Sequence, residues 1–265
     1  MHSAKMPCSI VILVYQLLQQ NHAPPQNNMS TPFPSCPQQL GLYAIVPNAD
    51  WLARVLEYGV DTVQLRVKSE DRHFVKNEIT RAVKISQSRA PHKPLFINDH
   101  WQMAIDAGAY GVHLGQTDID TADLNAIRHA GMRLGISTHN LAEIQRAQGL
   151  LPSYIAIGTV YLTTLKPMPS RPLGLAKLKE YVDFIRKDSS EKSSTQHNVQ
   201  STPKQHQHVQ TLPSPIALVA IGGINATSAS TVLACGVGSI AVVSAIIDAP
   251  DPHQAIIQLK QSIAQ

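Results

Sequence analysis

The segment Ile216-Ala-Leu-Val-Ala-Ile221 is apolar at every position, and Ile240-Ala-Val-Val243 repeats the pattern. Strands of this kind are typical of parallel sheets that are covered by helices on both faces. From this pair outward to Gly41, short β-rich runs alternate with segments of helical period. The predicted strands are Leu42–Val46, Thr62–Val67, Leu95–Asn98, Gly111–Leu114, Arg133–Ser137, Tyr154–Gly158, Ile216–Ile221 and Ser239–Val243.

Amphipathic segments follow these strands and predict crossover helices. The clearest of them are Asp71–Ser88, Thr121–Ala130, Leu141–Gly149, Gly174–Lys187, Thr227–Cys235 and Pro252–Ile263. Regular strand and helix units without a glycine-rich dinucleotide fingerprint favour one α/β domain closed into a (β/α)₈ TIM barrel. An open doubly wound sheet is the alternative. In a barrel, the functional side chains lie at the carboxyl ends of the strands.

Two polar segments interrupt this pattern. Residues 19–38 are rich in Gln, Asn and Pro, so residues 1–38 are predicted to be a disordered extension and residues 39–265 the barrel. Residues 188–214 form a Ser-, Gln- and His-rich insertion before the seventh strand, and we expect it to be flexible. The sequence leaves open whether Met1 or Met29 is the true start.

The composition limits the class of partner. The chain has 265 residues and a formal net charge of +4, without a block of consecutive Lys or Arg. We therefore expect no nucleic-acid and no membrane partner, whereas a homo-oligomer is allowed. Cys8, Cys36 and Cys235 are too few and too far apart for a disulfide framework or a zinc site, which favours a reducing, cytoplasmic setting.

Polar side chains alternate along the second predicted strand. In Thr62-Val-Gln-Leu-Arg-Val-Lys68, the residues Gln64, Arg66 and Lys68 share one face, because successive strand residues point to opposite faces. Burying these groups without partners is costly, so we expect them to line the barrel mouth and meet a phosphate or diphosphate. The alternative is an ion-pair network with structural carboxylates.

Two aspartates follow neighbouring strands. Asp99 comes directly after the third strand and Asp118 follows the fourth, so both are expected at the same end of the barrel. Mg²⁺ characteristically takes one or two carboxylates, with water and phosphate oxygens as its other ligands. The pair therefore predicts Mg²⁺ held between the protein and a diphosphate. Taken singly, each aspartate is more typical of a helix N-cap.

Further candidates follow the later strands. The hydroxyl of Ser137 is expected to donate to a phosphoryl oxygen, and Lys166 lies in a long loop that is predicted to close as a lid. The segments Ala220-Ile-Gly-Gly-Ile-Asn225 and Val242-Val-Ser-Ala245 predict a monophosphate site. A general-base role and a structural role both stay open for His113 and His139.

From Gly41 to its C-terminus, the chain resembles bacterial thiamine-phosphate synthase. The motifs that carry the resemblance occur in family order: Gln64-x-Arg66-x-Lys68, Ile97-Asn98-Asp99, Gly111-Val-His-Leu-Gly-Gln-x-Asp118, Gly135-x-Ser-x-His139, the Thr163–Lys166 loop, Ile221-Gly-Gly-Ile224 and Val243-Ser-Ala-Ile246. The resemblance implies a transferase that joins a pyrimidine diphosphate to a thiazole phosphate with the help of Mg²⁺. Thiamine phosphate and pyrophosphate would be the products.

The resemblance also implies a role for each matching residue. The pyrimidine diphosphate would be bound by Gln64, Arg66, Lys68, Asn98, Ser137 and Lys166, and Mg²⁺ by Asp99 and Asp118. The thiazole phosphate would be held by Thr163, Gly223, Val243 and Ser244. In the family the diphosphate leaves before or while the thiazole nitrogen attacks. Arg66, Lys68, Ser137 and Lys166 would then act catalytically, by stabilising charge.

The loop after the sixth strand departs from the family pattern Pro-Thr-x-Thr-Lys. Leu162 stands in place of Pro and Leu165 in place of the second Thr, so one hydroxyl for the thiazole phosphate is missing. A lost hydrogen bond to a charged group costs about 1.5 to 3 kcal/mol, unless Thr164 replaces it. The rival functions are a related barrel that isomerises the thiazole phosphate and a non-catalytic sensor of a phosphate ligand.

Overall fold

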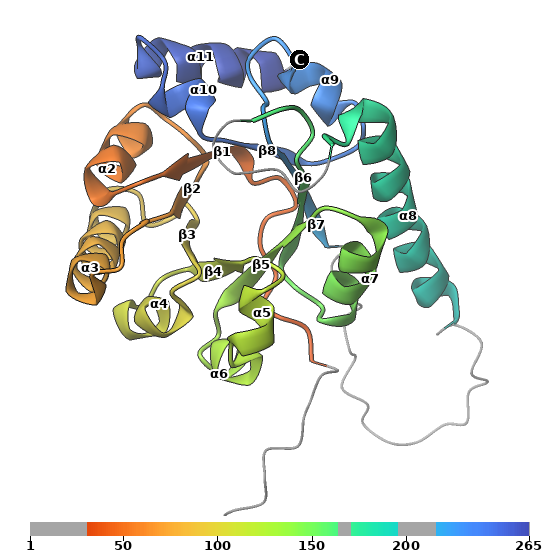
Figure 1. Ribbon diagram of the computed structural model, residues 1–265, viewed down its shortest axis with the longest axis horizontal. Coiled ribbons are helices and arrows are strands. Elements are labelled where there is room, and N and C mark those ends of the chain that lie inside the picture. The colour runs from red at the N-terminus through yellow and green to blue at the C-terminus, as the bar shows by residue number, and fades with distance from the viewer. Residues whose placement is uncertain (1–30, 164–170, 196–215, 265) are drawn as a thin grey trace, which may run out of the picture. The chain divides into compact units, whose positions relative to one another are not determined.

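The protein forms a closed barrel of parallel strands surrounded by helices (Figure 1). The computed structural model describes residues 31–163, 171–195 and 216–264, with only the backbone for residues 188–195. The strands are β1 Gly41–Val46, β2 Thr62–Leu65, β3 Leu95–Asn98, β4 Gly111–Leu114, β5 Arg133–Thr138, β6 Tyr154–Gly158, β7 Ala217–Ile221 and β8 Ser239–Val242. They pair in chain order, and β8 closes the barrel against β1.

Helices cover the outside of the barrel between successive strands. They are α2 Ala49–Glu57, α3 Arg72–Arg89, α4 Trp101–Ala107, α5 Asp118–Thr121, α6 Leu124–His129, α7 Leu141–Gly149, α8 Gly174–Thr195, α9 Ala229–Leu233, α10 Ser244–Ile247 and α11 Pro252–Ile263. The predicted TIM barrel is confirmed, because an open sheet would leave β1 and β8 unpaired. Within the described ranges, no helix has the length and apolarity needed to cross a bilayer.

Side-chain oxygens fix where several helices begin. Asn48, Asp71, Asp123, Asn140 and Asp251 each accept a hydrogen bond from a backbone N–H in the first turn of the helix that follows. The cap at Asp123 also explains one difference from the sequence prediction. The expected single helix over residues 121–130 is two short helices, α5 and α6, because Asp123 starts a new helix.

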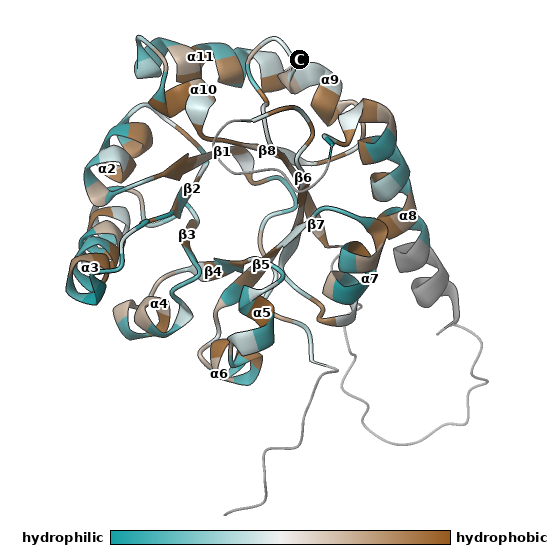
Figure 2. Cartoon of the chain, viewed as in Figure 1, coloured by the Kyte–Doolittle hydropathy of each residue, from teal (hydrophilic) through white to brown (hydrophobic). Residues whose placement is uncertain are grey.

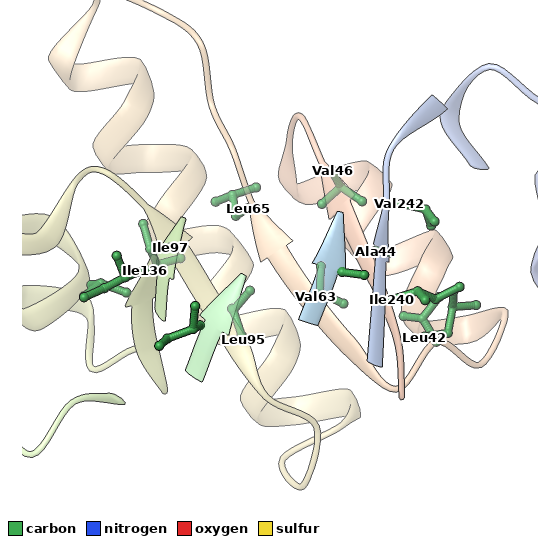
Figure 3. Packing of buried hydrophobic residues seen from close by; sticks show 14 of the residues in the cluster. Leu42, Ala44, Val46, Val63, Leu65, Leu95, Ile97, Ile136, Ile240 and Val242 are labelled. Atoms are coloured by element: carbon green, nitrogen blue, oxygen red, sulfur yellow. The ribbon is translucent and has the colours of Figure 1, made fainter. Parts of the chain in front are cut away.

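Alternation along the strands divides the core into two layers. Leu42, Ala44 and Val46 of β1 point outward and pack against the helices with their neighbours from the other strands (Figure 3). Tyr43 and Ile45 point into the barrel. Figure 2 shows both hydrophobic and hydrophilic residues on the surrounding helices, as expected for helices that pack on the barrel along one side.

Aromatic rings fill the inside of the barrel. The ring of Phe96 lies 5.0 Å from that of Tyr154 and 6.0 Å from that of Tyr43, measured between centroids. This packing leaves no space for a side chain at Gly135, where a Cβ atom would lie 2.1 Å from the Tyr154 ring. A glycine within a strand is explained here by the close approach of a bulky ring.

Residues 32–40 correct the predicted domain boundary. Phe33, Cys36 and Leu40 are buried, and the Phe33 N–H donates to the carbonyl of Leu151 at 3.0 Å. The Ser153 hydroxyl, just before β6, donates to the carbonyl of Pro34. These contacts lie at the amino ends of the strands, where the segment covers the barrel interior. The prediction that residues 32–38 belong to a disordered extension is therefore wrong, and residues 1–30 lie outside the described ranges.

The predicted insertion also begins later than expected. Helix α8 continues to Thr195, so residues 188–195 are helical. A helix that is already anchored by an apolar face needs no further apolar residues to continue, because each added residue only extends the existing hydrogen bonding. Residues 196–214, the remainder of the predicted insertion, lie outside the described residues.

The covering segment gives a stability prediction. Phe33 is 4% exposed and its ring centroid lies 4.3 Å from the guanidinium carbon of Arg128. We expect Phe33→Ala to lower the free energy of unfolding by about 3 to 5 kcal/mol, as for other buried phenylalanines. Phe74→Ala, at a site 48% exposed, is the matched control and should change it by no more than about 0.5 kcal/mol. Urea unfolding measures both, and equal effects would contradict the proposed covering.

Candidate active site

Polar side chains gather at the carboxyl ends of β2 and β3. Gln64 on β2 is buried inside the barrel, and its Nε2 donates to the hydroxyl of Tyr43 at 3.3 Å. Val63 and Leu65 pack on the helix side, as the alternation predicts. Lys68 is exposed, and its Nζ lies 3.4 Å from Oδ2 of Asp99.

Arg66 is a half-buried cation just beyond the end of β2. Its backbone N–H donates to the carbonyl of Val46 at 2.8 Å. Among the described residues, its guanidinium forms neither an ion pair nor a side-chain hydrogen bond. The alternative of an ion-pair network therefore has a carboxylate for Lys68, which pairs with Asp99, but none for Arg66 within this part of the chain.

Asp99 and Asp118 lie together beside Lys68. Asp99 follows β3 with a φ of +62°, and its backbone N–H donates to the carbonyl of His113 at 3.0 Å. Asp118 opens α5 and accepts the N–H of Gly115 on Oδ2 at 3.0 Å. Burial raises the pKa of the Asp99 carboxyl and the negative charge of Asp118 raises it further, whereas Lys68 opposes the rise. The two carboxylates are thus close enough to repel each other.

Neither aspartate serves as a helix N-cap. The N-cap residue of α4 is His100, which makes no side-chain capping bond, and the N-cap residue of α5 is Thr117.

A cavity of about 450 Å³ opens beside the pair, lined by both aspartates and by Arg72 and Trp101. In the described part of the chain, no group of three or more His, Cys, Asp or Glu encloses a metal site. Two carboxylates beside a cavity fit Mg²⁺, whose remaining ligands are water and phosphate oxygens.

Ser137 on β5 is held from inside the barrel by His113. Nε2 of His113 lies 2.7 Å from the Ser137 hydroxyl, and Nδ1 lies 2.7 Å from the hydroxyl of Tyr154. The Tyr154 hydroxyl in turn lies 2.8 Å from that of Tyr43. Burial lowers the pKa of His113 to about 4, and the nearby charge of Arg66 also lowers it. The ring is therefore neutral at physiological pH.

Asn98 and His139 have contrasting surroundings. Asn98 ends β3 and is buried, and its side-chain amide makes no hydrogen bond to a described residue. His139 and its backbone N–H both contact Oε2 of Glu143 at 2.8 Å. Glu143 also donates its N–H to the cap residue Asn140 at 3.0 Å. The His139 side chain is thus tied to the start of α7.

The ends of β6, β7 and β8 form a second polar region. The N–H of Tyr161 donates to the carbonyl of Gly222 at 3.0 Å. Gly223 has a φ of +65°, and a Cβ atom there would lie 2.5 Å from the carbonyl oxygen of Leu162, so only glycine fits. Val243 and Ser244 open α10 after the adjacent strand β8.

Two predicted residues of this region lie at or beyond the end of the described part of the loop after β6. Thr163 is the last described residue of the loop after β6, and the preceding Leu162 is 78% exposed. Lys166 and Leu165 lie outside the described residues. The structure therefore brings together the predicted residues of β2 to β5 at one end of the barrel and leaves the position of Lys166 undescribed.

Comparison with known proteins gives consistent matches. Residues 42–246 match the family model described as thiamine monophosphate synthase. The thiamine-phosphate synthase of Serratia proteamaculans is 45% identical over 236 residues, which cover 89% of this chain and 97% of that protein. That of Neisseria meningitidis serogroup A is 47% identical over 224 residues, which cover 84% and 94%.

Solved structures agree on the fold. A thiamine phosphate pyrophosphorylase from Pyrococcus furiosus superposes with a TM-score of 0.63 at 24% identity, and the match covers 85% of this chain and 96% of that one. A 3-hexulose-6-phosphate synthase from Salmonella typhimurium gives 0.52 at 16% identity, with 85% and 99% covered. At these identities the likeness is one of architecture alone.

Proposed function

Because the chain belongs to the thiamine monophosphate synthase family and is a transferase, we propose that its barrel mouth joins a pyrimidine diphosphate to a thiazole phosphate. Pyrophosphate is the second product. The observation that carries this proposal is the cation Arg66, which has no carboxylate partner among the described residues, at the same end of the barrel as the mutually repelling pair of Asp99 and Asp118. A site that combines a cation without a carboxylate partner and two neighbouring carboxylates suits a polyphosphate and a divalent cation together.

Asp99 and Asp118 would hold Mg²⁺ in this proposal. Bound there, the ion would neutralise negative charge on the diphosphate and make it a better leaving group. Binding would also relieve the repulsion that raises the pKa of Asp99. Lys68, whose Nζ is 3.4 Å from Asp99, is positioned to bring its own charge to the same phosphate oxygens.

The other residues orient the pyrimidine diphosphate and stabilise charge. The guanidinium of Arg66 offers planar paired donors to phosphate oxygens, and the Ser137 hydroxyl adds a further donor. The buried amides of Gln64 and Asn98 fit the polar edge of the pyrimidine. Lys166 would add a second cation. No side chain needs to form a covalent intermediate, because the work is electrostatic stabilisation of a departing anion.

The second polar region would hold the thiazole phosphate. Gly223 allows the loop after β6 to approach β7 closely, and its backbone with that of Val243 and Ser244 supplies N–H groups for a phosphate. Thr163 would contribute to the same phosphate site from the loop after β6. We further propose that residues 196–214 take no part in this chemistry and that the enzyme acts in the cytoplasm.

A direct assay tests the proposal. Purified protein with both substrates and Mg²⁺ is expected to release pyrophosphate and thiamine phosphate in equal amounts, and EDTA should abolish both. Chromatography of thiamine phosphate and an enzyme-coupled pyrophosphate assay measure them. Isomerisation of the thiazole phosphate without pyrophosphate release would support the rival enzyme, and binding without turnover would support the sensor.

A further inference from the structure

A chain of hydrogen bonds crosses the inside of the barrel and ends at Ser137. It runs from Gln64 to the hydroxyl of Tyr43 at 3.3 Å, then to the hydroxyl of Tyr154 at 2.8 Å. Nδ1 of His113 follows at 2.7 Å, and its Nε2 reaches the Ser137 hydroxyl at 2.7 Å. The first four side chains are buried, whereas Ser137 is half-buried and reaches the mouth. We call these five residues the interior chain.

The chemistry of its groups gives the interior chain a direction. The Nε2 of Gln64 can only donate, so the Tyr43 hydroxyl accepts there. The other described partner of this buried hydroxyl is Tyr154, so the direction that leaves no buried hydrogen of the interior chain unpaired has Tyr43 donating to Tyr154. Tyr154 then gives its hydrogen to Nδ1 of His113. A neutral imidazole that accepts at Nδ1 carries its hydrogen on Nε2, so His113 donates to the oxygen of Ser137.

The direction decides what Ser137 offers at the mouth. Since its oxygen accepts from His113, its own hydrogen is free to point toward the site. In the reverse direction Ser137 would give its hydrogen to His113 and present only lone pairs, which would repel an anion. That reversal would also make Tyr43 accept from Tyr154, and unless Gln64 turned its amide oxygen toward Tyr43, the buried Tyr43 hydrogen would have no described acceptor.

We infer that Tyr154 and His113 are positioning residues that fix Ser137 as a hydrogen-bond donor toward the departing diphosphate. This inference rests on the proposed function, because it assumes an anionic leaving group at the mouth. Two features hold the chain in place. Gly135 leaves space for the Tyr154 ring, and Phe96 packs edge-on against that ring at 5.0 Å between centroids.

The tautomer of His113 tests the direction without any substrate. In ¹⁵N-histidine-labelled full-length protein, NMR is expected to show His113 as the neutral tautomer with hydrogen on Nε2. His113→Gln assigns the signal among the 12 histidines of the chain. Hydrogen on Nδ1 would overturn the inference, whether or not the enzyme is active, so this result is separable from failure of the proposed function.

A double-mutant cycle tests the link to Ser137 in the active enzyme. Ser137→Ala and Tyr154→Phe are each expected to lower kcat on the order of ten-fold, the scale of a lost hydrogen bond to a charged group. If Tyr154 acts through Ser137, the double variant should be no slower than Ser137→Ala alone. Multiplied losses would overturn the inference.

Tyr43→Phe is the matched comparison for Tyr154→Phe. It removes a buried hydroxyl from the same aromatic cluster but leaves Tyr154 able to donate to His113, so its loss of kcat should be clearly smaller. An equal loss would mean that the hydroxyls matter only for packing. If a variant fails to fold, the tautomer of the wild-type protein still decides the question.

Discussion

Asp99→Asn is expected to lower kcat by about 10²- to 10³-fold, the usual effect of removing one preorganised electrostatic group from an active site. The substitution deletes a negative charge that the site uses to hold a divalent cation. Asparagine has almost the same shape and tolerates the φ of +62° at this position, whereas alanine would add backbone strain. The fold should therefore be unaffected, and the loss should come from charge alone.

A Mg²⁺ titration separates metal binding from other effects. Asp99→Asn should require a higher Mg²⁺ concentration for half-maximal rate, as well as showing a lower kcat. The matched control is Asp120→Asn, which makes the same change two residues after Asp118 at an exposed carboxylate paired with Arg146. It should leave both quantities near those of the wild type. An Asp99→Asn enzyme with unchanged kcat and Mg²⁺ dependence would contradict the metal assignment.

The barrel was predictable because its strands are buried on both faces. Runs such as Ile216-Ala-Leu-Val-Ala-Ile221 have no polar face, and their regular alternation with helical segments fixes the topology. The covering segment was not predictable in the same way. Phe33, Cys36 and Leu40 lie in a Pro-rich stretch without strand or helix period, and hydrogen-bond partners of Phe33 and Cys36 are more than a hundred residues away. No local pattern encodes such contacts.

The candidate site also contains features that the sequence predicts and features that it does not. Alternation along β2 places Gln64 inside the barrel, and the adjacency of strand ends brings Asp99 to Asp118, so both follow from the sequence. The link between Tyr43 and Tyr154 does not, since the two hydroxyls meet across the closed barrel from residues 111 positions apart. The glycine at position 135 was the available signal, because a strand glycine often marks the close approach of a large group.

Arg66→Ala is expected to lower kcat by about 10²- to 10³-fold with a smaller change in KM, because negative charge on the diphosphate grows as its bond breaks. The fold should tolerate the change. The guanidinium has no ion-pair partner among the described residues, so removing it leaves no described carboxylate without a partner. Arg89→Ala, at an exposed position at the end of α3, makes the same change in net charge away from the mouth and should keep wild-type kinetics.

Arg66→Lys distinguishes charge from geometry. Lysine keeps the positive charge but loses the planar pair of donors that matches two phosphate oxygens, so it should restore part of the lost kcat and not all of it. Steady-state kinetics with the pyrimidine diphosphate varied at saturating Mg²⁺ measures each variant. A rise in KM at unchanged kcat would mean that Arg66 binds substrate and transition state equally. The guanidinium would then hold the diphosphate without helping it to leave, and the electrostatic part of the mechanism would have to come from Lys68 and the aspartate pair.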